Sequence, residues 1–585
     1  MDSAKSDSEV SNIASPAKAL FSGYLCSESI VPFPSVAEDE KETLHFIVES
    51  VDKFMSNREE DFRQFDLEGQ QPEDYLNELR ELGLFSLIIP EEYSGLGLSN
   101  TGYSRILQQT SRYDGSTSLT IGAHSSIGMK ALLLFGTEAQ KEKYLPRLAT
   151  GELIAAFCLT ESGSGSDAAS IKTEAVKNSD GTYSLSGEKI WITNGGTAGF
   201  FTVFAKTAGD NGKMTAFIVE RDWAGVSVGP KEDKMGIRAS CTTTVRFDSV
   251  RVSSDAILGE EGKGFKVAMA VLNNGRTGLG GGCVGAMKRL IELSVAQAEQ
   301  RKQFGQPISE FKLIKEKLAL MTTLCFATES IVSVVGHLID SGSEDFSIEA
   351  AMSKIFASEA LWCVADEALQ ISGGNGFMRE FPYERVVRDS RINRIFEGTN
   401  EILRLYVALS GLKDPAEHLK GVSKSLQGIF NDPIKGFGVL SDYASRRVGQ
   451  MTSLGRPRLQ GVSSVLQSET RALEQGVLKL GQAVDGVLLK HRKGIIGEQL
   501  ISKRLADIAT DLFVGMCVLS RVSSYISDKG AAACSSEIQV AKVFSHLARV
   551  RITNNFRALF SNADEHLIGL ADHIRQSQGY PWDTI

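Results

Sequence analysis

Glu397 is the residue whose type and setting most clearly suggest chemistry. It lies in the sequence Phe396-Glu397-Gly398-Thr399, where the glycine lets a substrate approach the backbone closely. A carboxylate in a dry, apolar pocket has a raised proton affinity and can act as a general base. A glutamate in an isolated loop is usually a solvated surface charge, so the surrounding sequence must support the catalytic hypothesis.

Two further segments have the composition of a ligand-binding site. Residues 160–167 have the sequence Thr-Glu-Ser-Gly-Ser-Gly-Ser-Asp, whose small side chains and clustered N–H groups favour an anion or a planar ligand. Residues 191–196, Trp-Ile-Thr-Asn-Gly-Gly, combine a tryptophan with a threonine hydroxyl at a predicted strand end. Such a pair can cover an aromatic ring and hydrogen-bond its heteroatoms. Each segment alone could be an ordinary loop, but the two together favour binding.

Residues 280–285 match the pattern G-x-G-x-x-G. A dinucleotide fingerprint requires a strand before this pattern and a βαβ unit around it. The preceding residues 267–274 have helical spacing instead, so we expect a close-packed stretch near the start of a helix. The eight cysteines are far apart and lack metal-ligand spacing, which predicts free, buried thiols and no metal site.

The elements that must position these residues follow from the apolar periodicity. The spacing is helical from about residue 38 to 151, changes to short β-rich runs up to about 258, and is helical again from 264 to 412. We therefore predict an α+β protein whose β-domain is antiparallel. The expected parts are an N-terminal surface arm (1–35), a helical domain (36–155), a β-domain (156–262), a helical bundle (263–412), a connector (413–439) and a further helical domain (440–585).

Composition excludes several classes of protein. The 585 residues are 42% hydrophobic, which is globular usage, and 63 basic against 72 acidic residues give a net charge of −9. This balance argues against nucleic-acid binding. No run reaches 18 apolar residues, so we expect no transmembrane helix. The N-terminus has early acids and no apolar segment, so we expect neither a secretory signal nor an organelle presequence.

Five motifs, in order and spacing, resemble the acyl-CoA dehydrogenase family, and most closely its very-long-chain branch with an extra C-terminal helical domain. The motifs are Ala156–Glu161 with Gly165–Ser170, Trp191–Gly196, Arg301–Gly305, Gln370–Phe377 and Arg394–Asn400. The resemblance covers roughly residues 35–412. It implies the family's fold, which is an N-terminal helical domain, a middle antiparallel β-domain and a C-terminal four-helix bundle, here followed by the additional helical domain.

The resemblance also implies FAD as cofactor and Glu397 as the catalytic base. Glu397 would remove the α-proton of an acyl-CoA thioester while the β-hydrogen leaves as hydride, and its backbone N–H and a flavin hydroxyl would polarise the carbonyl. The implied FAD contacts are Phe157, Leu159, Thr160, Gly165, Ser166, Trp191, Ile192, Thr193, Thr399 and Asn400 and, toward the FAD of a neighbouring subunit, Arg301, Phe304, Gln370, Gly373 and Gly374.

For the substrate, the resemblance points to Ser166, Phe396 and Gly398, and to Arg276 as a group that could hold the coenzyme A moiety. An arginine at a helix end without a partner is the alternative for Arg276. Gly122 and Ala123 are small residues where the family forms the base of the acyl pocket, so a long acyl tail should run deeper. We expect His124 to be a packed histidine and not an acid or base.

The implied function is FAD-dependent conversion of a long- or very-long-chain acyl-CoA to a trans-2-enoyl-CoA in fatty acid β-oxidation. Electrons would pass to an electron-transferring flavoprotein. Two alternatives stay open: an acyl-CoA oxidase that passes electrons to oxygen, and a scaffold for respiratory-complex assembly with residual activity. We expect an intracellular homodimer, in the bacterial cytoplasm or the mitochondrial matrix and peripheral on the inner membrane.

Residues 443–493 suggest the membrane contact. No acidic residue lies between Tyr443 and Ser468, a stretch that contains Arg446, Arg447, Arg456 and Arg458. The next helix has an apolar stripe and ends in Lys490-His491-Arg492-Lys493; the stripe is Leu473, Val477, Leu480, Val484, Val487 and Leu488. Basic residues and an apolar face together favour an anionic lipid surface. The alternative is that the stripe packs into the domain's own core and the arginines lie on a solvated loop.

Overall fold

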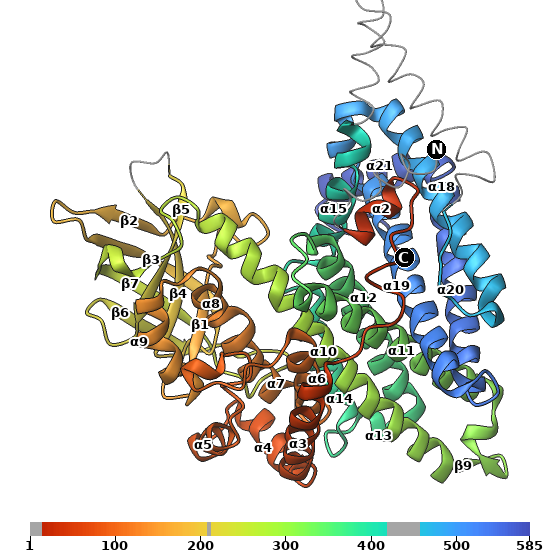
Figure 1. The fold of residues 1–585 in the computed structure, drawn as a ribbon, viewed down its shortest axis with the longest axis horizontal. Helices are drawn as coiled ribbons and strands as arrows, with labels where there is room; N and C mark the ends of the chain where they lie inside the picture. Colours follow the sequence, from red (N-terminus) through yellow and green to blue (C-terminus); the bar gives the residue numbers. More distant parts are fainter. Residues whose placement is uncertain (1–14, 208–211, 418–456, 585) are drawn as a thin grey trace, which may run out of the picture. The chain divides into compact units, whose positions relative to one another are not determined.

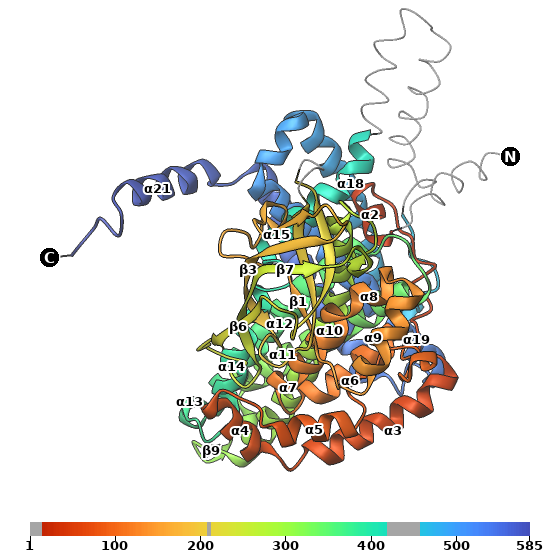
Figure 2. The same ribbon diagram turned by 90° about the vertical axis from the view of Figure 1, so that its left-hand side faces the viewer.

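The computed structural model describes residues 15–207, 212–417 and 457–584, which belong to two compact units. One unit contains residues 33–403, and the other contains residues 1–32 together with 404–585. Figures 1 and 2 show the helices and strands of each. All residues of the candidate site lie in the first unit.

The first unit begins with helices. Those between residues 38 and 122 contribute to one core cluster, and the two that follow, between residues 130 and 149, contribute to the core of the β-domain. Figure 2 shows the first three side by side. The helices are α3 (Glu38–Met55), α4 (Glu59–Glu68), α5 (Glu73–Glu81), α6 (Asn100–Ser111), α7 (Gly115–Gly122), α8 (Lys130–Phe135) and α9 (Glu138–Ala149). Asp114 caps the N-terminus of α7 by accepting from Thr117 N. Between α7 and α8 the chain forms a π-helical turn, η2 (Ala123–Gly128), a conformation that is rare and often occurs at functional sites.

The β-domain is one sheet with the strand order β6-β7-β3-β2-β4-β5-β8, and β1 pairs with β4. The strands are β1 (Ala155–Cys158), β2 (Glu174–Lys177), β3 (Tyr183–Thr193), β4 (Phe200–Thr207), β5 (Met214–Glu220), β6 (Val226–Lys231), β7 (Thr242–Val252) and β8 (Ile257–Leu258). The expectation of a purely antiparallel sheet was wrong for two pairs, because β1 and β2 both run parallel to β4. Neither strand reaches β4 through a hairpin, and only a hairpin would force the antiparallel direction.

The start of the next helix packs against the sheet through Val267, Ala268 and Val271, and this helix and those after it form the bundle (Figure 1). The helices are α10 (Gly264–Gln300), α11 (Lys312–Asp340), α12 (Ser347–Ser372), α13 (Gly374–Phe377) and α14 (Tyr383–Ser390), and α15 (Asn400–Gly411) follows. A short hairpin, β9 (Lys302–Gln303) and β10 (Gln306–Pro307), joins α10 to α11. The alternation of helix, sheet and helix matches the fold class expected from the sequence.

The glycine-rich run at 280–285 lies in the middle of α10 and not near its start, which corrects its predicted place. A Cβ on Gly285 would lie 1.9 Å from Gln108 O, and one on Gly281 would lie 2.5 Å from Ser104 Oγ. Both neighbours are on α6, so these glycines let the α6 backbone approach α10 closely. Because the motif lies inside a helix and not at a turn between a strand and a helix, it is not a dinucleotide fingerprint.

Among the described helices, α11 alone has the length and hydropathy needed to cross a membrane. In its most apolar window, 56% of the residues are buried inside the protein, as in the core helix of a bundle. The eight cysteines are all free, and five of them are buried.

The second unit contains α2 (Pro16–Phe21), α18 (Gln467–His491), α19 (Gln499–Lys529), α20 (Ser535–Phe560) and α21 (Asp564–Gln576). We expected the N-terminal arm to lie over the surface, but its described part is packed into this unit. Leu20 and Phe21 on α2 are completely buried, and Ile30 accepts a hydrogen bond from Ser520 Oγ on α19. Helix α21 has no buried residue and reaches away from the other helices of this unit (Figure 2).

The apolar stripe of α18 packs inside this unit. All six of its side chains are at most 8% exposed, and a Cβ on Gly515 of α19 would lie 3.1 Å from Leu473 Cδ1. The stripe is therefore core, and its predicted contact with lipid was wrong. Arg446, Arg447 and Arg456 lie outside the described residues, whereas Lys490, Arg492 and Lys493 are exposed.

Candidate active site

Glu397 lies in a strained turn between the 3-10 helix η6 (Arg391–Arg394) and α15. Its φ is +58° and that of Gly398 is +88°, so two consecutive residues are left-handed. For a glutamate this conformation costs about 1–3 kcal/mol and persists only where surrounding contacts enforce it. Arg276 Nε on α10 donates to the Glu397 carbonyl at 3.4 Å, and Lys354 Nζ on α12 donates to the Gly398 carbonyl at 2.8 Å.

The Glu397 carboxylate is in an apolar and nearly donor-free environment. Its Oε2 atom is buried and has no hydrogen-bond partner among the residues that the structure describes. It lies 3.6 Å from the place a Cβ on Gly275 would occupy, beside Ile127 and Ser126 of η2. Burial raises the pKa of Glu397, and the charges of Arg276 and Lys354 partly oppose that rise. This is the electrostatic setting of a general base.

Arg276 is at the base and not at the surface. The residue is 5% exposed, and its Nη1 donates to Asn273 Oδ1 at 2.6 Å. It lies within α10, so it is neither a helix-end residue nor an exposed group facing solvent. This geometry favours a role in holding the Glu397 backbone over the expected contact with coenzyme A.

Gly122 is buried at the end of α7, and its surroundings connect it to the base. Its carbonyl accepts from Ser126 Oγ at 2.6 Å and from Tyr103 OH at 3.4 Å. The Glu397 charge raises the pKa of Tyr103, whose main perturbation is burial. A Cβ on Gly122 would lie 3.8 Å from Leu107 Cδ1, so a methyl group would fit there in ordinary van der Waals contact.

His124 is a packed histidine, as expected. It is completely buried, its Nδ1 accepts from Ala155 N at 2.9 Å, and its Nε2 lies 3.1 Å from the carbonyl of Phe85. This pattern requires one ring proton, and burial lowers the pKa of His124 to about 4. The neutral ring therefore joins η2 to the start of β1.

The segment 160–173 is organised by a buried ion pair that sequence analysis missed. Lys189 Nζ on β3 donates to Glu161 Oε1 at 2.7 Å and to the Leu159 carbonyl at 3.1 Å. Glu161 also accepts from Lys172 N and Thr173 N at 2.6 and 3.0 Å. The signal in the sequence was Lys189 at an inward position of a strand, where a lysine needs a buried partner.

Comparison with known proteins supports one assignment throughout. The N-terminal, middle and C-terminal domain models of acyl-CoA dehydrogenase match residues 41–152, 156–250 and 262–412, and the "ACAD9/ACADV, C-terminal domain" model matches 464–580. The chain is 46% identical to the very long-chain specific acyl-CoA dehydrogenase, mitochondrial, of Macaca fascicularis, over 96% of this chain and 88% of the relative. The chain belongs to the acyl-CoA dehydrogenase family.

Two other relatives broaden the comparison. A probable acyl-CoA dehydrogenase of Bacillus subtilis is 40% identical over 87% of this chain and 84% of its own length. The acyl-CoA dehydrogenase of Bacillus anthracis, solved in complex with FAD, has a TM-score of 0.80 at 34% identity and covers 97% of this chain and 96% of its own. The predicted family and its extra C-terminal domain are therefore confirmed, and the chain is an enzyme of the acyl-CoA dehydrogenase class.

Five predicted flavin residues of this dehydrogenase lie at the far end of the bundle from Glu397. Lys354, beside the base, and Gln370 are on the same helix, about 24 Å apart along its axis. Phe304 is 94% exposed, and Arg301, Gln370, Gly373 and Gly374 are exposed too. Within one subunit, Gln370 and the turn that carries Glu397 are therefore separated by most of the length of α12.

Thr399 and Asn400 already have local roles in the dehydrogenase. Thr399 Oγ1 accepts from Ile402 N at 3.3 Å and caps α15. Asn400 is 1% exposed, and its amide donates to Ser358 Oγ and Glu359 Oε1 of α12 at 3.0 Å each. Their predicted FAD contact stays a prediction.

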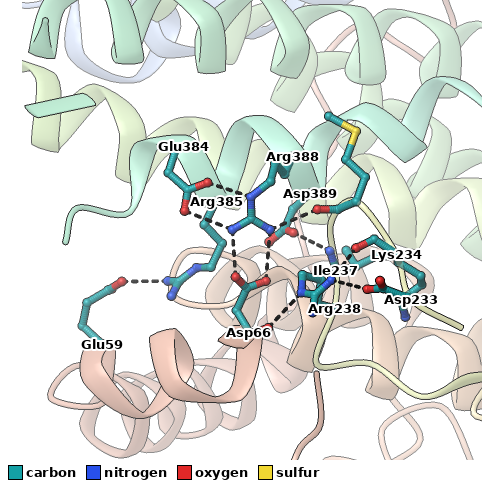
Figure 3. A network of polar contacts seen from close by, with 11 residues as sticks. Glu59, Asp66, Asp233, Lys234, Ile237, Arg238, Glu384, Arg385, Arg388 and Asp389 are labelled. Atoms are coloured by element: carbon teal, nitrogen blue, oxygen red, sulfur yellow. Dashed lines mark hydrogen bonds and ion pairs between the residues drawn. The ribbon is translucent and has the colours of Figure 1, made fainter. Parts of the chain in front are cut away.

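A polar junction joins the three domains of the dehydrogenase's first unit (Figure 3). Arg388 on α14 donates to both oxygens of Asp66 on α4, at 3.1 and 2.8 Å, and to Glu384. Asp389 accepts from the backbone N–H of Ile237 in the β6–β7 loop. Because α14 leads directly into η6 and the base turn, the junction positions the base-bearing chain against the β-domain.

Proposed function

We propose that the protein is an FAD-dependent dehydrogenase that converts long- or very-long-chain acyl-CoA to trans-2-enoyl-CoA in fatty acid β-oxidation. The observation that carries this proposal is the Glu397 carboxylate in its enforced left-handed turn, whose Oε2 atom is buried and has no hydrogen-bond partner among the described residues. Without a base, neither the strain nor the desolvation of this carboxylate has a use.

The residues expected to contact FAD fit a large planar group. Trp191 is 64% exposed on a strand and has a φ of +57°, which presents its ring outward while Ile192 stays 2% exposed. A Cβ on Gly165, Gly373 or Gly374 would meet no atom within 4 Å, so these backbones are open to a ligand. The other expected contacts lie on the strands β1 and β3 or in the segment that follows β1; they are Phe157, Leu159, Thr160, Ser166 and Thr193.

The chain's own groups supply acid–base chemistry and orientation. Glu397 removes the α-proton, and its backbone N–H donates to the thioester oxygen as negative charge develops there. The bound flavin supplies the hydride acceptor. The apolar wall formed by Ile127 and Gly275 excludes water, which keeps the proton affinity of Glu397 high.

Chain length and substrate contacts follow from the residues around Gly122. Gly122 has no side chain to block the end of the proposed acyl site near Leu107, and on steric grounds this favours acyl tails of about fourteen carbons or more. The very-long-chain enzyme of Macaca fascicularis, at 46% identity, supports this preference. Ser166, Phe396 and Gly398 would contact the acyl-CoA near the turn.

We further propose that electrons pass to an electron-transferring flavoprotein and that the active form is a homodimer in the mitochondrial matrix or the bacterial cytoplasm. Mitochondrial and bacterial relatives both support these locations. The apolar stripe within residues 443–493 is core, so we propose peripheral membrane contact only through the basic residues of this segment. Co-sedimentation with anionic and neutral liposomes tests it.

The deciding experiment uses purified holoenzyme and acyl-CoAs of four to twenty carbons. Anaerobic bleaching of the flavin by a long acyl-CoA, slow reoxidation in air and rapid electron transfer to an electron-transferring flavoprotein are the expected results. Fast reoxidation with peroxide release would establish the oxidase instead. No bleaching by any acyl-CoA, with FAD bound, would favour the assembly scaffold.

A further inference from the structure

Lys354 is a completely buried lysine on α12, beside the turn that carries the base. Lysine is rarely fully buried unless it is paired. Its Nζ donates to the Gly398 carbonyl and to Asn400 Oδ1, at 2.8 Å each. Neither acceptor carries a full charge, so these bonds satisfy two of the three N–H donors without neutralising the ammonium.

The two hydrogen bonds of Lys354 tie the C-terminal part of the strained turn and the start of α15 to one helix. Gly398 directly follows the base, and Asn400 begins α15. Asn400 returns to α12 through its own bonds to Ser358 and Glu359. The left-handed backbone of Glu397 is therefore held at its own carbonyl by Arg276 of α10, and at the carbonyl of the next residue by Lys354 of α12.

The charges that face Lys354 come from three elements. They are the carboxylates of Glu397 in the turn and Glu359 on α12, the guanidinium of Arg276 on α10 and the thiol of Cys283 on α10. The pKa of Lys354 is lowered to about 7, mainly by burial and also by Arg276, while Glu397 opposes the lowering. In return the Lys354 charge lowers the pKa of Glu397 against its burial.

We propose that Lys354 is a positioning residue for the proposed proton abstraction, which fixes the turn that aims Glu397 and whose charge keeps this base ionised. It acts through Glu397 and does not touch the substrate. The inference rests on the proposed role of Glu397. A lysine that only joined α12 to the turn would affect stability and flavin retention but not the ionisation of the base.

The test compares Lys354→Met, which removes donor and charge, Lys354→Gln, which keeps a donor without charge, and Lys354→Arg, which keeps both. Lys288→Met is the matched control, because Lys288 belongs to the same bundle and pairs with Glu329 and Gln108 away from the base. The readout is the pH dependence of kcat/KM for a long-chain acyl-CoA with each purified holoenzyme. Flavin content and thermal midpoint are measured in parallel.

Loss of the charge should shift the acidic limb of the profile to higher pH by about one unit in the methionine and glutamine variants. The arginine variant and Lys288→Met should keep the wild-type limb. Should the methionine variant fail to fold, the contrast between glutamine and arginine still decides. An unchanged limb in the glutamine variant, or an equal shift in the arginine variant, overturns the proposal.

Glu397→Gln, assayed alongside, separates the two levels of inference. If it retains turnover, the base assignment itself fails. If it is inactive while the uncharged Lys354 variants keep the wild-type limb, only the role of Lys354 fails.

Discussion

At the scale of single residues, the proposed base Glu397 differs from a paired carboxylate because its Oε2 atom has no hydrogen-bond donor among the described residues. Most buried carboxylates in this chain have donors, as Glu161 does from Lys189 and Thr173. Glu397 Oε2 has none among the described residues. Burying a carboxylate oxygen without a hydrogen-bond donor destabilises the folded protein. A high proton affinity of the proposed base explains why this loss of stability is tolerated.

Glu397→Gln should lower turnover by on the order of 10²–10⁴-fold, because the amide keeps the shape but cannot accept the proton. FAD content and the folded structure should stay as in the wild type. Steady-state turnover and the visible flavin spectrum check both expectations. Near-normal turnover would show that another group is the base.

The same substitution should change stability with pH. Burial raises the pKa of Glu397 above its ordinary 4.5, so the folded chain binds more protons than the unfolded chain between these two values. Folding stability is therefore lost as pH rises through that window. Glu397→Gln should melt above the wild type at pH 8, with the difference shrinking toward pH 4. A constant difference across this range would contradict the buried, unpaired carboxylate.

Gly122→Gln should shorten the longest acyl chain that is turned over. The new side chain must occupy the space beside Leu107, and a close-packed wall does not yield without a cost of about 1–3 kcal/mol. The measurement is kcat/KM across acyl-CoAs of eight to twenty carbons, with Gly122→Ala as control, since a methyl group fits there. An identical chain-length profile in all three proteins would remove Gly122 from the acyl site.

At the scale of elements, the site depends on how three domains meet at the junction of Figure 3. The β6–β7 loop packs so closely on α14 that a Cβ on Gly236 would lie 2.4 Å from the Arg388 carbonyl. Asp389, next in sequence, is 9% exposed and faces the same loop. Movement of α14 would thus move both the β-domain contact and the base turn.

Arg388→Met should destabilise the protein by on the order of 3 kcal/mol, because it leaves Asp66 and Glu384 with little exposure and no partner at this site. Arg246→Met is the matched control. Arg246 pairs with Glu188 at the surface, where such pairs contribute about 0–1 kcal/mol. Chemical unfolding followed by tryptophan fluorescence compares the two. Equal losses would mean that the junction does not stabilise the domain contact.

At the scale of the whole molecule, the proposed homodimer gives a role to five exposed residues at the far end of the bundle, which would complete the flavin site of the other subunit. Phe304 presents a large apolar ring with 94% exposure, which is unfavourable unless another surface covers it. In a closed dimer, each such surface would serve the partner's site.

This arrangement predicts complementation between two inactive variants. Glu397→Gln and the double variant Arg301→Gln with Phe304→Ala should each be inactive as homodimers. A heterodimer of the two has one site with an intact base and intact partner contacts, so it should regain about half of the wild-type activity. Differently tagged chains, co-expressed and purified through both tags, provide the sample. Activity no greater than that of the homodimers would place all flavin contacts within one subunit.

The sequence by itself determined the family and the succession of helix, sheet and helix, and it singled out Glu397 as the candidate base. Motifs such as Arg394–Asn400 and Trp191–Gly196 are local, and the apolar periods of 3.6 and 2 report which side of an element is buried. These local patterns can be interpreted without knowing which other element packs against the buried side.

Only the tertiary structure decided what each buried face meets. The α18 stripe has the same period whether it faces lipid or protein, and packing on α19 makes it core. Lys354 is 43 residues from Glu397 in sequence, so its bond to the base turn was invisible until α12 and the turn met. The parallel pairing of β1 and β2 with β4 and the burial of α2 are likewise non-local. Contacts between distant segments depend on chain topology and close packing, which local spacing does not encode.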